Sequence, residues 1–453
     1  MKTAMREKLI RGIQDRSLRL TVLGSGYVGL PTAALFADAG FKVVAVDIKP
    51  EVVAAVNSGV SPINEPSLEE FVSRNVQAGR LKATLNSTEA LTRADTVIIS
   101  VQTPIDQNKK PNLSFLMEAL KEVGKSMEER MLVVVSSTVP PGTMLRKVKP
   151  KLESLSDLKA DVGFYLAYVP ERIAPGKALK EFVESPRLVG GVGPNSTKIA
   201  AELFRTVCKK VIETDASTAE VSKLAENTFR DVNIAFANQL ALICERHGVD
   251  AAEVIKLANT HPRVNIHMPG PGVGGPCLPK DPYLLIHKTE LGEQNIIKTA
   301  RQINDYMPKR VINLILQALK KAGKEIGDSK TAILGTAYKA NVDDSRLSPS
   351  EPIIHGLIRL GSKVAVYDPH CNETFGAKKT TSLREVVKGT DCLAIITDHA
   401  EFRNLNLQEI KALMNKNPII IDARRIVNSH KAKNLGYIYD GVGFGNSTTE
   451  KQS

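Results

Sequence analysis

Short apolar runs alternate with longer helical stretches in the first third of the chain. The segments 18–24 (LRLTVLG) and 42–47 (KVVAVD) are rich in branched apolar residues, which predicts two strands. The stretch 27–40 between them is largely apolar and ends at a glycine, which predicts a helix. Further strands are predicted at 96–101 (TVIISV) and 131–137 (MLVVVSS). This alternation predicts a parallel, doubly wound sheet of the α/β class.

A long helical stretch replaces this pattern from about Ser217 to a glycine at position 248. It contains no proline and runs for about 30 residues, or roughly 45 Å at 1.5 Å per residue. A helix of that length is expected either to pack against a second subunit or to span two domains of one chain.

The alternation of strands and helices starts again after a Lys-rich segment, and the sequence repeats itself there. Strands are expected at 331–339, 363–369, 391–397 and 417–425, with a helix near 350–361. ILGTAYK matches VLGSGYVG, and GSKVAVYD matches GFKVVAVD, so the two α/β units form an internal repeat. The second copy keeps Gly335 but follows it with Thr336 and Ala337. We expect it to keep the fold without the same pyrophosphate-binding turn.

Composition and charge narrow the functional classes. Of 453 residues, 42% are hydrophobic and 24% are charged, which is typical of a globular protein with two or three domains. The formal charge of +12 favours an acidic small substrate or a solvated basic surface, because Lys and Arg are scattered without a nucleic-acid motif. No apolar run approaches the roughly 20 residues of a membrane span, and the N-terminus lacks the apolar core of a secretory signal. We therefore expect a cytoplasmic protein with neither a nucleic-acid nor a membrane partner.

The most informative motif is the series Gly24, Gly26 and Gly29, which follows a predicted strand and opens a predicted helix. The first glycine permits a tight turn, the second lets the backbone approach a pyrophosphate, and the third allows close packing of helix on strand. Asp47 ends the next strand, where a carboxylate accepts hydrogen bonds from a ribose and repels a 2′-phosphate. This predicts NAD rather than NADP, while the neighbouring Lys49 acts in the opposite direction. A glycine turn that serves only packing is the alternative.

A second unusual segment is the Gly- and Pro-rich run 269–281 (PGPGVGGPCLPKD), which excludes regular secondary structure. It carries Cys277 beside Lys280 and Asp281, and a nearby cation favours the nucleophilic thiolate. The other cysteines lie in apolar segments or in a loop without such neighbours (Cys208, Cys244, Cys371 and Cys392). Their odd number and the absence of CxxC spacing indicate neither a disulfide framework nor a zinc site, so no metal is expected. Cys277 is predicted to be either a catalytic nucleophile or a buried structural cysteine.

A nucleophilic thiol on a chain with a dinucleotide site suggests oxidation of an alcohol or aldehyde through a thiohemiacetal and a thioester. Five separate motifs add to this. They are GSGYVGLP (24–31), STVPPGT (137–143), PER (170–172), AEVSKLAENTF (219–229) and the Cys277 loop. With them, the sequence from about Leu18 to about Gly443 resembles the UDP-glucose/GDP-mannose dehydrogenase family.

The resemblance implies two Rossmann-like, doubly wound parallel-sheet domains joined by a helical dimerisation domain with a long central helix. It implies that residues 1–213 bind NAD, that residues 214–325 dimerise and carry the Cys277 loop, and that residues 326–453 bind UDP. The implied activity is a four-electron oxidation of C6 of a UDP-sugar to the uronate. Two NAD are reduced per turnover, and the implied assembly is a homodimer or a higher homo-oligomer.

Carried over by motif, the resemblance implies catalytic roles around C6. Cys277 would hold C6 first as a thiohemiacetal and then as a thioester. Lys223 and Asp281 would flank C6 and handle its charge and protons, while Asn227 would donate to the developing oxyanion. Lys223 and Asn227 are four residues apart and share one helix face, so a solvated polar stripe is the alternative.

Two loop residues complete the implied catalytic set. Glu171 matches a glutamate linked to thioester hydrolysis, and Thr138 matches a threonine that positions water near the nicotinamide. A loop carboxylate and a turn hydroxyl are the alternatives. The expected cofactor site is formed by Gly24, Gly26, Tyr27, Val28, Gly29, Asp47, Lys49, Thr103 and Thr138.

Substrate binding is implied for residues in several motifs. Lys339 and Arg424 match positions that hold the uridine diphosphate, although exposed cations commonly hold nothing. The run HPRVNI (261–266) and the segment PERIAPG resemble the branch that oxidises UDP-N-acetyl-D-mannosamine. In that branch the residue matching Arg263 reaches into the substrate site, and a route across a dimer interface stays open. The expected substrate-binding set is Glu171, Arg172, Lys223, Asn227, His261, Arg263, Gly274, Lys339 and Arg424.

The sequence leaves alternatives open for the substrate and for the functional class. UDP-N-acetylglucosamine and UDP-glucose are alternative substrates, and only the PKD part of a GFGGSCFPKD loop is present. Pro276 stands where relatives carry His or Ser; it removes a backbone donor and puts rate or specificity in question. A two-electron dehydrogenase with a structural Cys277, and a non-catalytic nucleotide-sensing or nucleic-acid-binding protein, are the other functional classes. The basic N-terminal segment has no counterpart in the family pattern.

Overall fold

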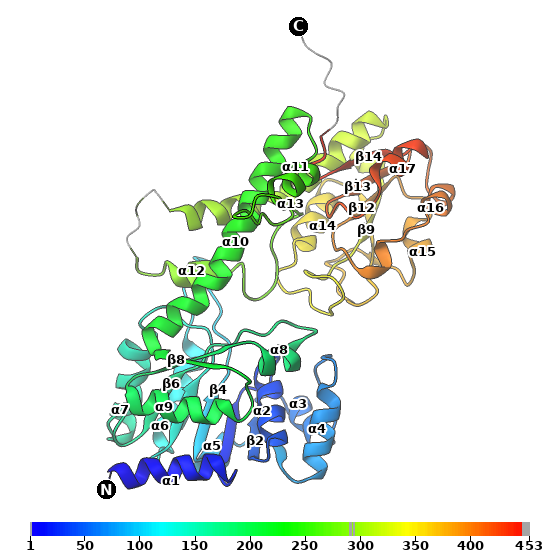
Figure 1. Ribbon diagram of the computed structural model, residues 1–453. Helices are drawn as coiled ribbons and strands as arrows, with labels where there is room; N and C mark the ends of the chain where they lie inside the picture. Colours follow the sequence, from blue (N-terminus) through cyan, green and yellow to red (C-terminus); the bar gives the residue numbers. More distant parts are fainter. Residues whose placement is uncertain (1, 290–291, 293–294, 446–453) are drawn as a thin grey trace. The chain divides into compact units, whose positions relative to one another are not determined.

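The computed structural model describes residues 2–289, 292 and 295–445. The chain divides into two compact units, which are Met1–Glu226 with Tyr283–Thr289 and Asn227–Pro282 with Glu290–Ser453. Figure 1 traces the chain by colour through both units, each of which contains one β-sheet. Each sheet has a hydrophobic core on each of its two faces.

The sheet of the first unit has eight strands in the order β3-β2-β1-β4-β5-β6-β7-β8. Strands β1 to β6 are parallel, which confirms the doubly wound arrangement expected for this part of the chain. The exceptions are β7, which is antiparallel to β6, and β8, which is parallel to β7. The connection through α8 (Ala178–Glu184) starts β7 at the same edge of the sheet at which β6 ends. The strand bounds are Arg19–Leu23 (β1), Lys42–Val46 (β2), Leu81–Thr84 (β3), Thr96–Ile99 (β4), Leu132–Val135 (β5), Tyr165–Tyr168 (β6), Arg187–Gly191 (β7) and Val211–Asp215 (β8).

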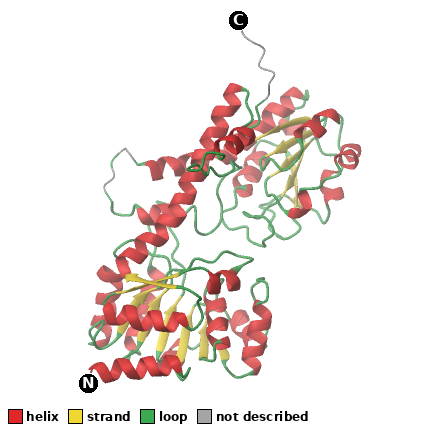
Figure 2. Cartoon of the chain, in the orientation of Figure 1, coloured by secondary structure: helices red, strands yellow, loops and turns green. Residues whose placement is uncertain are grey.

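Helices cover both faces of this sheet, as the red elements around the yellow strands in Figure 2 show. Helices α1 to α4, α8 and α9 pack on one face, and α5 to α7 pack on the other. Both faces are buried, so every residue of the central strands β4 and β5 is buried, and all of these residues except Thr96 are apolar. The helix bounds are Lys2–Gln14 (α1), Gly29–Asp38 (α2), Pro50–Asn57 (α3), Leu68–Gln77 (α4), Ser87–Thr92 (α5), Ser114–Lys125 (α6), Lys149–Ser156 (α7) and Pro194–Arg205 (α9), with a π-helical turn η1 at Met144–Val148.

The sheet of the second unit has six parallel strands in the order β11-β10-β9-β12-β13-β14. β9 and β10 pair as β1 and β2 do, so the internal repeat predicted from the sequence is confirmed. Helices α13 and α14 cover one face, and α15 to α17 cover the other. The bounds are Lys330–Leu334 (β9), Lys363–Tyr367 (β10), Lys378–Lys379 (β11), Cys392–Ile395 (β12), Ile419–Asp422 (β13), Ile438–Gly441 (β14), Ala251–Ala258 (α11), Asp281–Leu285 (α12), Ile296–Lys321 (α13), Ser350–Arg359 (α14), Leu383–Val387 (α15), Leu407–Leu413 (α16) and Ser429–Asn434 (α17).

The predicted long helix is α10 (Ala216–His247), whose 32 residues belong partly to the first unit and partly to the second. It ends as predicted at Gly248, which adopts a φ of +68°. Within the second unit, the buried Asp231 Oδ1 lies 2.5 Å from Arg301 Nη1 and 2.9 Å from Asn304 Nδ2. The pairing of α10 with α13 is therefore specified by hydrogen bonds as well as by apolar packing. Among the described helices, none is long and apolar enough to span a bilayer.

The basic N-terminal segment forms α1 and belongs to the core of the first unit. Leu9 and Ile13 are buried in the core that also contains α2 and α9. Arg6 Nη1 donates to Asn195 Oδ1, at the start of α9, at 3.2 Å. The segment that lacked a counterpart in the sequence motifs therefore has a structural role.

We predict that Ile13→Ala destabilises the first unit by about 2–5 kcal/mol, because it leaves a cavity in a close-packed core. Thermal unfolding followed by circular dichroism measures the change. Gln14→Ala, at the neighbouring exposed position, is the control and is expected to leave Tm unchanged. An unchanged Tm in Ile13→Ala would show that α1 does not contribute to the folded core.

Candidate active site

The turn between β1 and α2 has the geometry of a phosphate-binding turn. Gly24 adopts a φ of +92°, which favours glycine, and a Cβ there would lie 2.5 Å from the Ser100 carbonyl oxygen. A Cβ on Gly29 would overlap the Gly24 carbonyl oxygen, so this glycine allows the helix to approach the strand. Gly26 is exposed, and no atom of the described residues lies within 4 Å of the position of its Cβ. The backbone at Gly26 is therefore open to a ligand at the helix N-terminus, as the pyrophosphate of NAD requires.

Asp47 follows β2 beside the same turn. Its carboxylate accepts hydrogen bonds from the backbone N–H groups of Ser25 (2.9 Å) and Lys49 (3.0 Å). These bonds fix the carboxylate at the carboxyl edge of the sheet, while its side chain stays half-buried. Tyr27 and Val28 are also half-buried, just ahead of α2. The expected cofactor residues of this turn therefore lie together, and Lys49 contributes through its backbone.

Two loops, after β4 and after β5, lie against each other at this edge. Thr103 Oγ1 donates to the Thr138 carbonyl oxygen at 2.6 Å, and Ser137 Oγ donates to the Val101 carbonyl oxygen at 2.7 Å. The structure therefore brings Thr103 and Thr138 together at the carboxyl ends of adjacent strands. That is where a doubly wound sheet binds a dinucleotide.

Glu220 holds the second of these loops and was not identified from the sequence. From α10, its carboxylate accepts hydrogen bonds from the N–H groups of Gly142 (2.6 Å) and Met144 (2.7 Å). Burial raises the pKa of Glu220 to about 7, against the opposing effect of these two donors. A carboxylate within the AEVSKLAENTF motif, one turn before Lys223, was the signal available in the sequence.

Glu171, in the PER turn after β6, is buried and paired. Its Oε1 lies 3.0 Å from Nη1 of Arg187, which is itself only 2% exposed. Arg187 was not predicted as a functional residue, because no local pattern marks it. Arg172, expected to bind substrate, has other partners: its guanidinium pairs with Glu226 at 2.6 Å and donates to the Pro186 carbonyl oxygen. Arg172 is therefore engaged within the protein.

Lys223 and Asn227 lie one turn apart on α10 and are both 7% exposed. Because both side chains are buried, the alternative interpretation of a solvated polar stripe is excluded. The described residues include no ion-pair partner for Lys223.

Cys277 is exposed, whereas the other four cysteines are buried. Burial raises the pKa of those four thiols, which keeps them in the neutral form (Cys208, Cys244, Cys371 and Cys392). The alternative of a buried structural cysteine at position 277 is therefore wrong. An accessible thiol is what a nucleophile requires.

The turn that follows Cys277 buries a carboxylate. The N–H groups of Lys280 and Asp281 donate to the Cys277 carbonyl oxygen at 3.0 and 2.8 Å. Asp281 is 1% exposed, and its Oδ2 accepts a hydrogen bond from Asn227 Nδ2 at 2.6 Å. Its Oδ1 lies 3.8 Å from Lys280 Nζ and has no hydrogen-bond partner among the described residues. A buried carboxylate oxygen with spare capacity near an accessible thiol is suited to proton transfer.

The glycine-rich loop packs against the loop 338–349, which carries Lys339. A Cβ on Gly274 would lie 2.6 Å from the Leu347 carbonyl oxygen. A Cβ on Gly275 would lie 2.6 Å from a ring carbon of the tyrosine that precedes Lys339. Gly274 is therefore needed for the close approach of the two loops, and any contact with substrate would use its backbone.

Arg424 follows β13 and reaches the same glycine-rich loop. A Cβ on Gly270 would lie 3.1 Å from Arg424 Nη1. Arg424 Nε donates to the Ile396 carbonyl oxygen at 2.8 Å, and burial lowers the pKa of the guanidinium. The structure therefore brings Arg424 and the loop of Lys339 to one segment, as expected for two cations of a diphosphate site.

His261 and Arg263 are not brought to this segment. Both are exposed after α11, and the Arg263 N–H donates to His261 Nδ1 at 3.3 Å. Within the described chain, no hydrogen bond or ion pair links either residue to the Cys277 loop.

Asp368 ends β10 of the second unit, at the position of the ribose-binding carboxylate in the repeat. It accepts hydrogen bonds from the N–H groups of Thr336 (2.7 Å) and Ala337 (3.0 Å), and it lies 3.0 Å from His399 Nε2. His399 Nδ1 accepts the N–H of Asn341 at 2.9 Å, so Nε2 carries the proton. Burial would raise the pKa of Asp368, but these bonds hold it well below its usual range. The carboxylate is therefore fully engaged, which fits the expected loss of the pyrophosphate turn.

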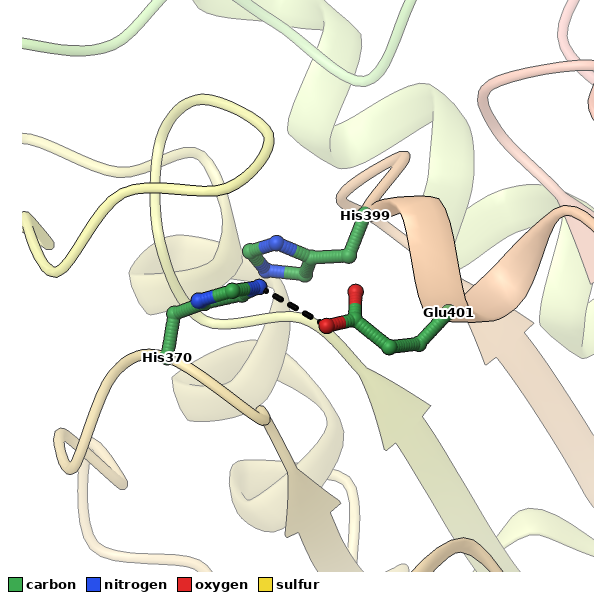
Figure 3. A group of neighbouring side chains, drawn as sticks. All are labelled: His370, His399 and Glu401. Carbon is green, nitrogen blue, oxygen red and sulfur yellow. Dashed lines mark ion pairs between the residues drawn. The ribbon is translucent and has the colours of Figure 1, made fainter. Parts of the chain in front are cut away.

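His370, His399 and Glu401 form a cluster of metal-ligating residue types that the sequence analysis did not identify (Figure 3). Their candidate ligand atoms lie within 4.8 Å of one another, and His370 Nε2 is 3.1 Å from Glu401 Oε1. Both ring nitrogens of His399 are already hydrogen-bonded to protein groups, so this ring offers no lone pair to a metal. We assign His399 to holding the loop that carries Lys339.

Comparison with known proteins finds family models that match three consecutive parts of the chain. Three models of the UDP-glucose/GDP-mannose dehydrogenase family match it: the NAD binding domain over 18–208, the central domain over 217–306 and the UDP binding domain over 332–429. The chain belongs to the UDP-glucose/GDP-mannose dehydrogenase family. The predicted family, the NAD cofactor and the oxidoreductase class are thereby confirmed.

Relatives in this family are similar over nearly the whole chain. The UDP-N-acetyl-D-mannosamine dehydrogenase of Pyrococcus horikoshii is 43% identical over 429 residues, which are 94% of this chain and 100% of that protein. A solved structure of UDP-D-ManNAc dehydrogenase from the same organism has a TM-score of 0.89 at 42% identity and covers 95% of this chain and 100% of its own. The NDP-N-acetyl-D-galactosaminuronic acid dehydrogenase of Methanosarcina mazei Go1 has a TM-score of 0.84 at 37% identity and covers 98% of each chain.

We predict that Gly26→Val weakens NAD binding without unfolding the protein, because the new side chain occupies only the space into which the pyrophosphate fits. The KM for NAD is expected to rise at least about tenfold, or about 1.4 kcal/mol, in steady-state kinetics. Gly29→Ala is the contrasting variant and is expected to lower Tm, since its Cβ overlaps backbone. A normal KM for NAD in Gly26→Val would contradict the assigned site.

Proposed function

We propose that this dehydrogenase catalyses the NAD-dependent four-electron oxidation of C6 of UDP-N-acetyl-D-mannosamine to the uronate. One observation carries the proposal: the exposed Cys277 is followed by the buried Asp281, whose Oδ1 has no hydrogen-bond partner among the described residues. A four-electron oxidation needs a nucleophile that retains the aldehyde between two hydride transfers. An accessible thiol near an acid-base group meets this need.

The oxidation steps use residues of α10 and of the Cys277 loop. NAD, when bound at the glycine turn, accepts one hydride from C6 in each of two steps. Asp281 takes up the proton of the C6 hydroxyl as the aldehyde forms, and Lys223 stabilises the negative charge that develops on the oxygen. The Cys277 thiolate then adds to the aldehyde carbon, and Asn227 donates to the oxyanion that develops. Loss of the second hydride converts the thiohemiacetal into a thioester.

Hydrolysis then releases the uronate. Water adds to the thioester carbon, the C6–S bond breaks, and Cys277 leaves as the thiolate. Glu171 accepts a proton from the attacking water, and Thr138 positions water near the nicotinamide. One water is consumed and two hydrides leave C6 in each turnover.

The substrate assignment is supported by charge and by the relatives. We propose that Lys339 and Arg424 bind the diphosphate, since both lie at loops that contact the glycine-rich segment. Relatives named UDP-N-acetyl-D-mannosamine dehydrogenase are 37–43% identical to this chain. A relative named NDP-N-acetyl-D-galactosaminuronic acid dehydrogenase, at 36%, makes a second hexosamine the main competitor. Substrate roles for Arg172, His261 and Gly274 stay predictions.

We predict that the protein forms two NADH per molecule of UDP-N-acetyl-D-mannosamine, because both oxidations occur before release. Absorbance at the NADH band is measured against UDP-N-acetylglucosamine, UDP-glucose, UDP-galactose and UDP-N-acetylgalactosamine as competing substrates. Cys277→Ala is expected to lose at least about 10³-fold of uronate formation. Cys244→Ala, at a buried thiol, is the matched control and keeps the stoichiometry of two.

Three outcomes would contradict parts of this proposal. One NADH per sugar, or full activity in Cys277→Ala, would rule out the thioester route and favour a two-electron dehydrogenase. Preference for another sugar of the panel would correct the substrate alone. Tight NAD binding without turnover of any UDP-sugar would favour a non-catalytic role.

We propose that the functional regions are 1–213 for NAD, 214–325 for dimerisation and the Cys277 loop, and 326–453 for UDP. The limits of the three matching family models support this division. The compact units differ from it because their packing divides the helical region within α10.

We also propose that the chain forms a homodimer through α10. Phe229, Phe236 and Ile243 follow one another at intervals of seven residues, or two helical turns, and are 66%, 55% and 44% exposed. Side chains at this spacing form one stripe along a helix, and an exposed apolar stripe is typical of a helix–helix interface. The family resemblance leaves open that Arg263 reaches the substrate site across a dimer interface. The exposure of Arg263 is consistent with that role.

We predict that Phe236→Glu converts the dimer into a monomer, because it buries a charge in an apolar seam. Light scattering coupled to size-exclusion chromatography measures the mass. Phe115→Glu, at an equally exposed phenylalanine on α6, is the control and keeps the mass of the unaltered protein. A monomeric unaltered protein, or a dimeric Phe236→Glu, would refute the assignment.

A further inference from the structure

Arg187 is the largest of the fully buried side chains in the described chain, and the mechanism above does not use it. It is the first residue of β7. Because β7 is antiparallel to β6, with Tyr168 opposite Gly190, the start of β7 lies beside the end of β6. Glu171 follows β6 in the PER turn, so the antiparallel strand brings a guanidinium to the glutamate assigned to hydrolysis.

Three N–H donors converge on one oxygen of Glu171. Its Oε1 accepts hydrogen bonds from the N–H groups of Arg172 (2.6 Å) and Ile173 (2.8 Å) and from Arg187 Nη1 (3.0 Å). Its Oε2 makes no hydrogen bond to any described residue. The carboxylate is therefore fixed through Oε1 and presents Oε2 as an acceptor.

The surroundings of Arg187 are poorly explained by stability alone. Its guanidinium lies 4.2 Å from the centre of the Phe182 ring and donates to the Pro170 carbonyl oxygen at 3.2 Å. Its Nε is buried and has no hydrogen-bond partner among the described residues. Desolvation of an ion pair offsets its Coulomb attraction, more so where a donor stays unsatisfied. The guanidinium nevertheless fixes the position of the Glu171 carboxylate through Oε1.

Other titratable groups nearby do not replace Arg187. Arg172 is paired with Glu226 at 2.6 Å. Cys208 lies close to Arg187, but burial raises the pKa of its thiol, which stays neutral and donates to the Phe182 carbonyl oxygen at 3.3 Å. In the described part of the chain, Arg187 is the cation paired with Glu171.

We propose that Arg187 is a positioning residue for thioester hydrolysis, which holds Oε1 of Glu171 and leaves its Oε2 directed to the hydrolytic water. This inference rests on the proposed function, in which Glu171 accepts the proton of that water. The water oxygen bonds to C6, the electron pair of the C6–S bond leaves on the Cys277 sulfur, and one water proton moves to Oε2. Arg187 touches none of these atoms and acts through Oε1.

Arg187→Met tests the proposal, because methionine keeps much of the side-chain length but carries no charge. We expect the initial burst of two NADH per active site to persist, while steady-state turnover falls about 10- to 100-fold. Thioester is expected to accumulate on Cys277, detected by rapid quench and intact-mass spectrometry.

Two further variants separate positioning from stability. Arg187→Lys keeps a cationic donor, so hydrolysis is expected to slow only about 3- to 10-fold, with little thioester accumulation. Arg301→Met removes a guanidinium from another buried ion pair, and it is expected to lower Tm without thioester accumulation. Equal slowing of burst and hydrolysis in Arg187→Met, or a change in Tm alone, overturns the proposal. If that variant does not fold, hydrolysis at the normal rate in Arg187→Lys overturns it.

Glu171→Gln distinguishes a failure of this inference from a failure of the proposed function. If Glu171→Gln accumulates thioester and Arg187→Met does not, Arg187 is not a positioning residue, whereas the role of Glu171 stands. If Glu171→Gln hydrolyses the thioester at the normal rate, both assignments are wrong. The double variant is expected to be no slower than Glu171→Gln alone, because Arg187 acts through Glu171.

Discussion

Carboxylate side chains that accept hydrogen bonds from backbone N–H groups hold the loops at the carboxyl edges of both sheets. Among the described residues, the carboxylates that do so include Asp47, Glu65, Glu171, Glu220, Asp368 and Asp422. These loops cannot use the ladder of a strand or the bonds of a helix to satisfy their amides, and an unpaired amide near the core is costly. The positions of the loops that carry the expected cofactor and catalytic residues depend on these bonds.

The same interaction explains how one repeated unit serves two purposes. In the first copy, Asp47 accepts two amides, stays half-buried, and lies beside the open backbone of Gly26. In the second copy, Asp368 is buried and its capacity is used by the corresponding turn and by His399. The engaged carboxylate then anchors a loop that carries Lys339. The same repeated unit therefore offers a dinucleotide site in the first copy and holds the loop of Lys339 in the second.

Buried charge contributes both to packing and to the candidate site. The buried Asp231 and Arg301 pair α10 with α13. Arg187 and Asp281, at the candidate site, each keep one polar atom without a hydrogen-bond partner among the described residues, which costs stability. The N-terminal helix α1 makes the opposite contribution, because its apolar side chains enlarge the core without approaching the carboxyl edge of the sheet.

Much of the fold was predictable because it depends on local pattern. The long helix, the strands of the repeat and the ends marked by glycine follow from periodicity and from conformations that glycine adopts readily. The reversed direction of β7 and the role of α1 were not predicted. Both depend on where a segment packs against the rest of the sheet, and the local sequence of the segment does not specify that place.

The sequence by itself determined the alternation of strands and helices and the glycine turn for NAD, and it left Cys277 as either a nucleophile or a buried structural cysteine. These features follow from neighbours along the chain. Only the tertiary structure decided which carboxylate holds which loop, how Asn227 meets Asp281 and why Glu171 faces Arg187. Those partners are 54 residues apart in the first pair and 16 in the second, and the distance is closed only when the strands and helices pack. Pairing of distant polar groups depends on burial and geometry, which no local pattern contains.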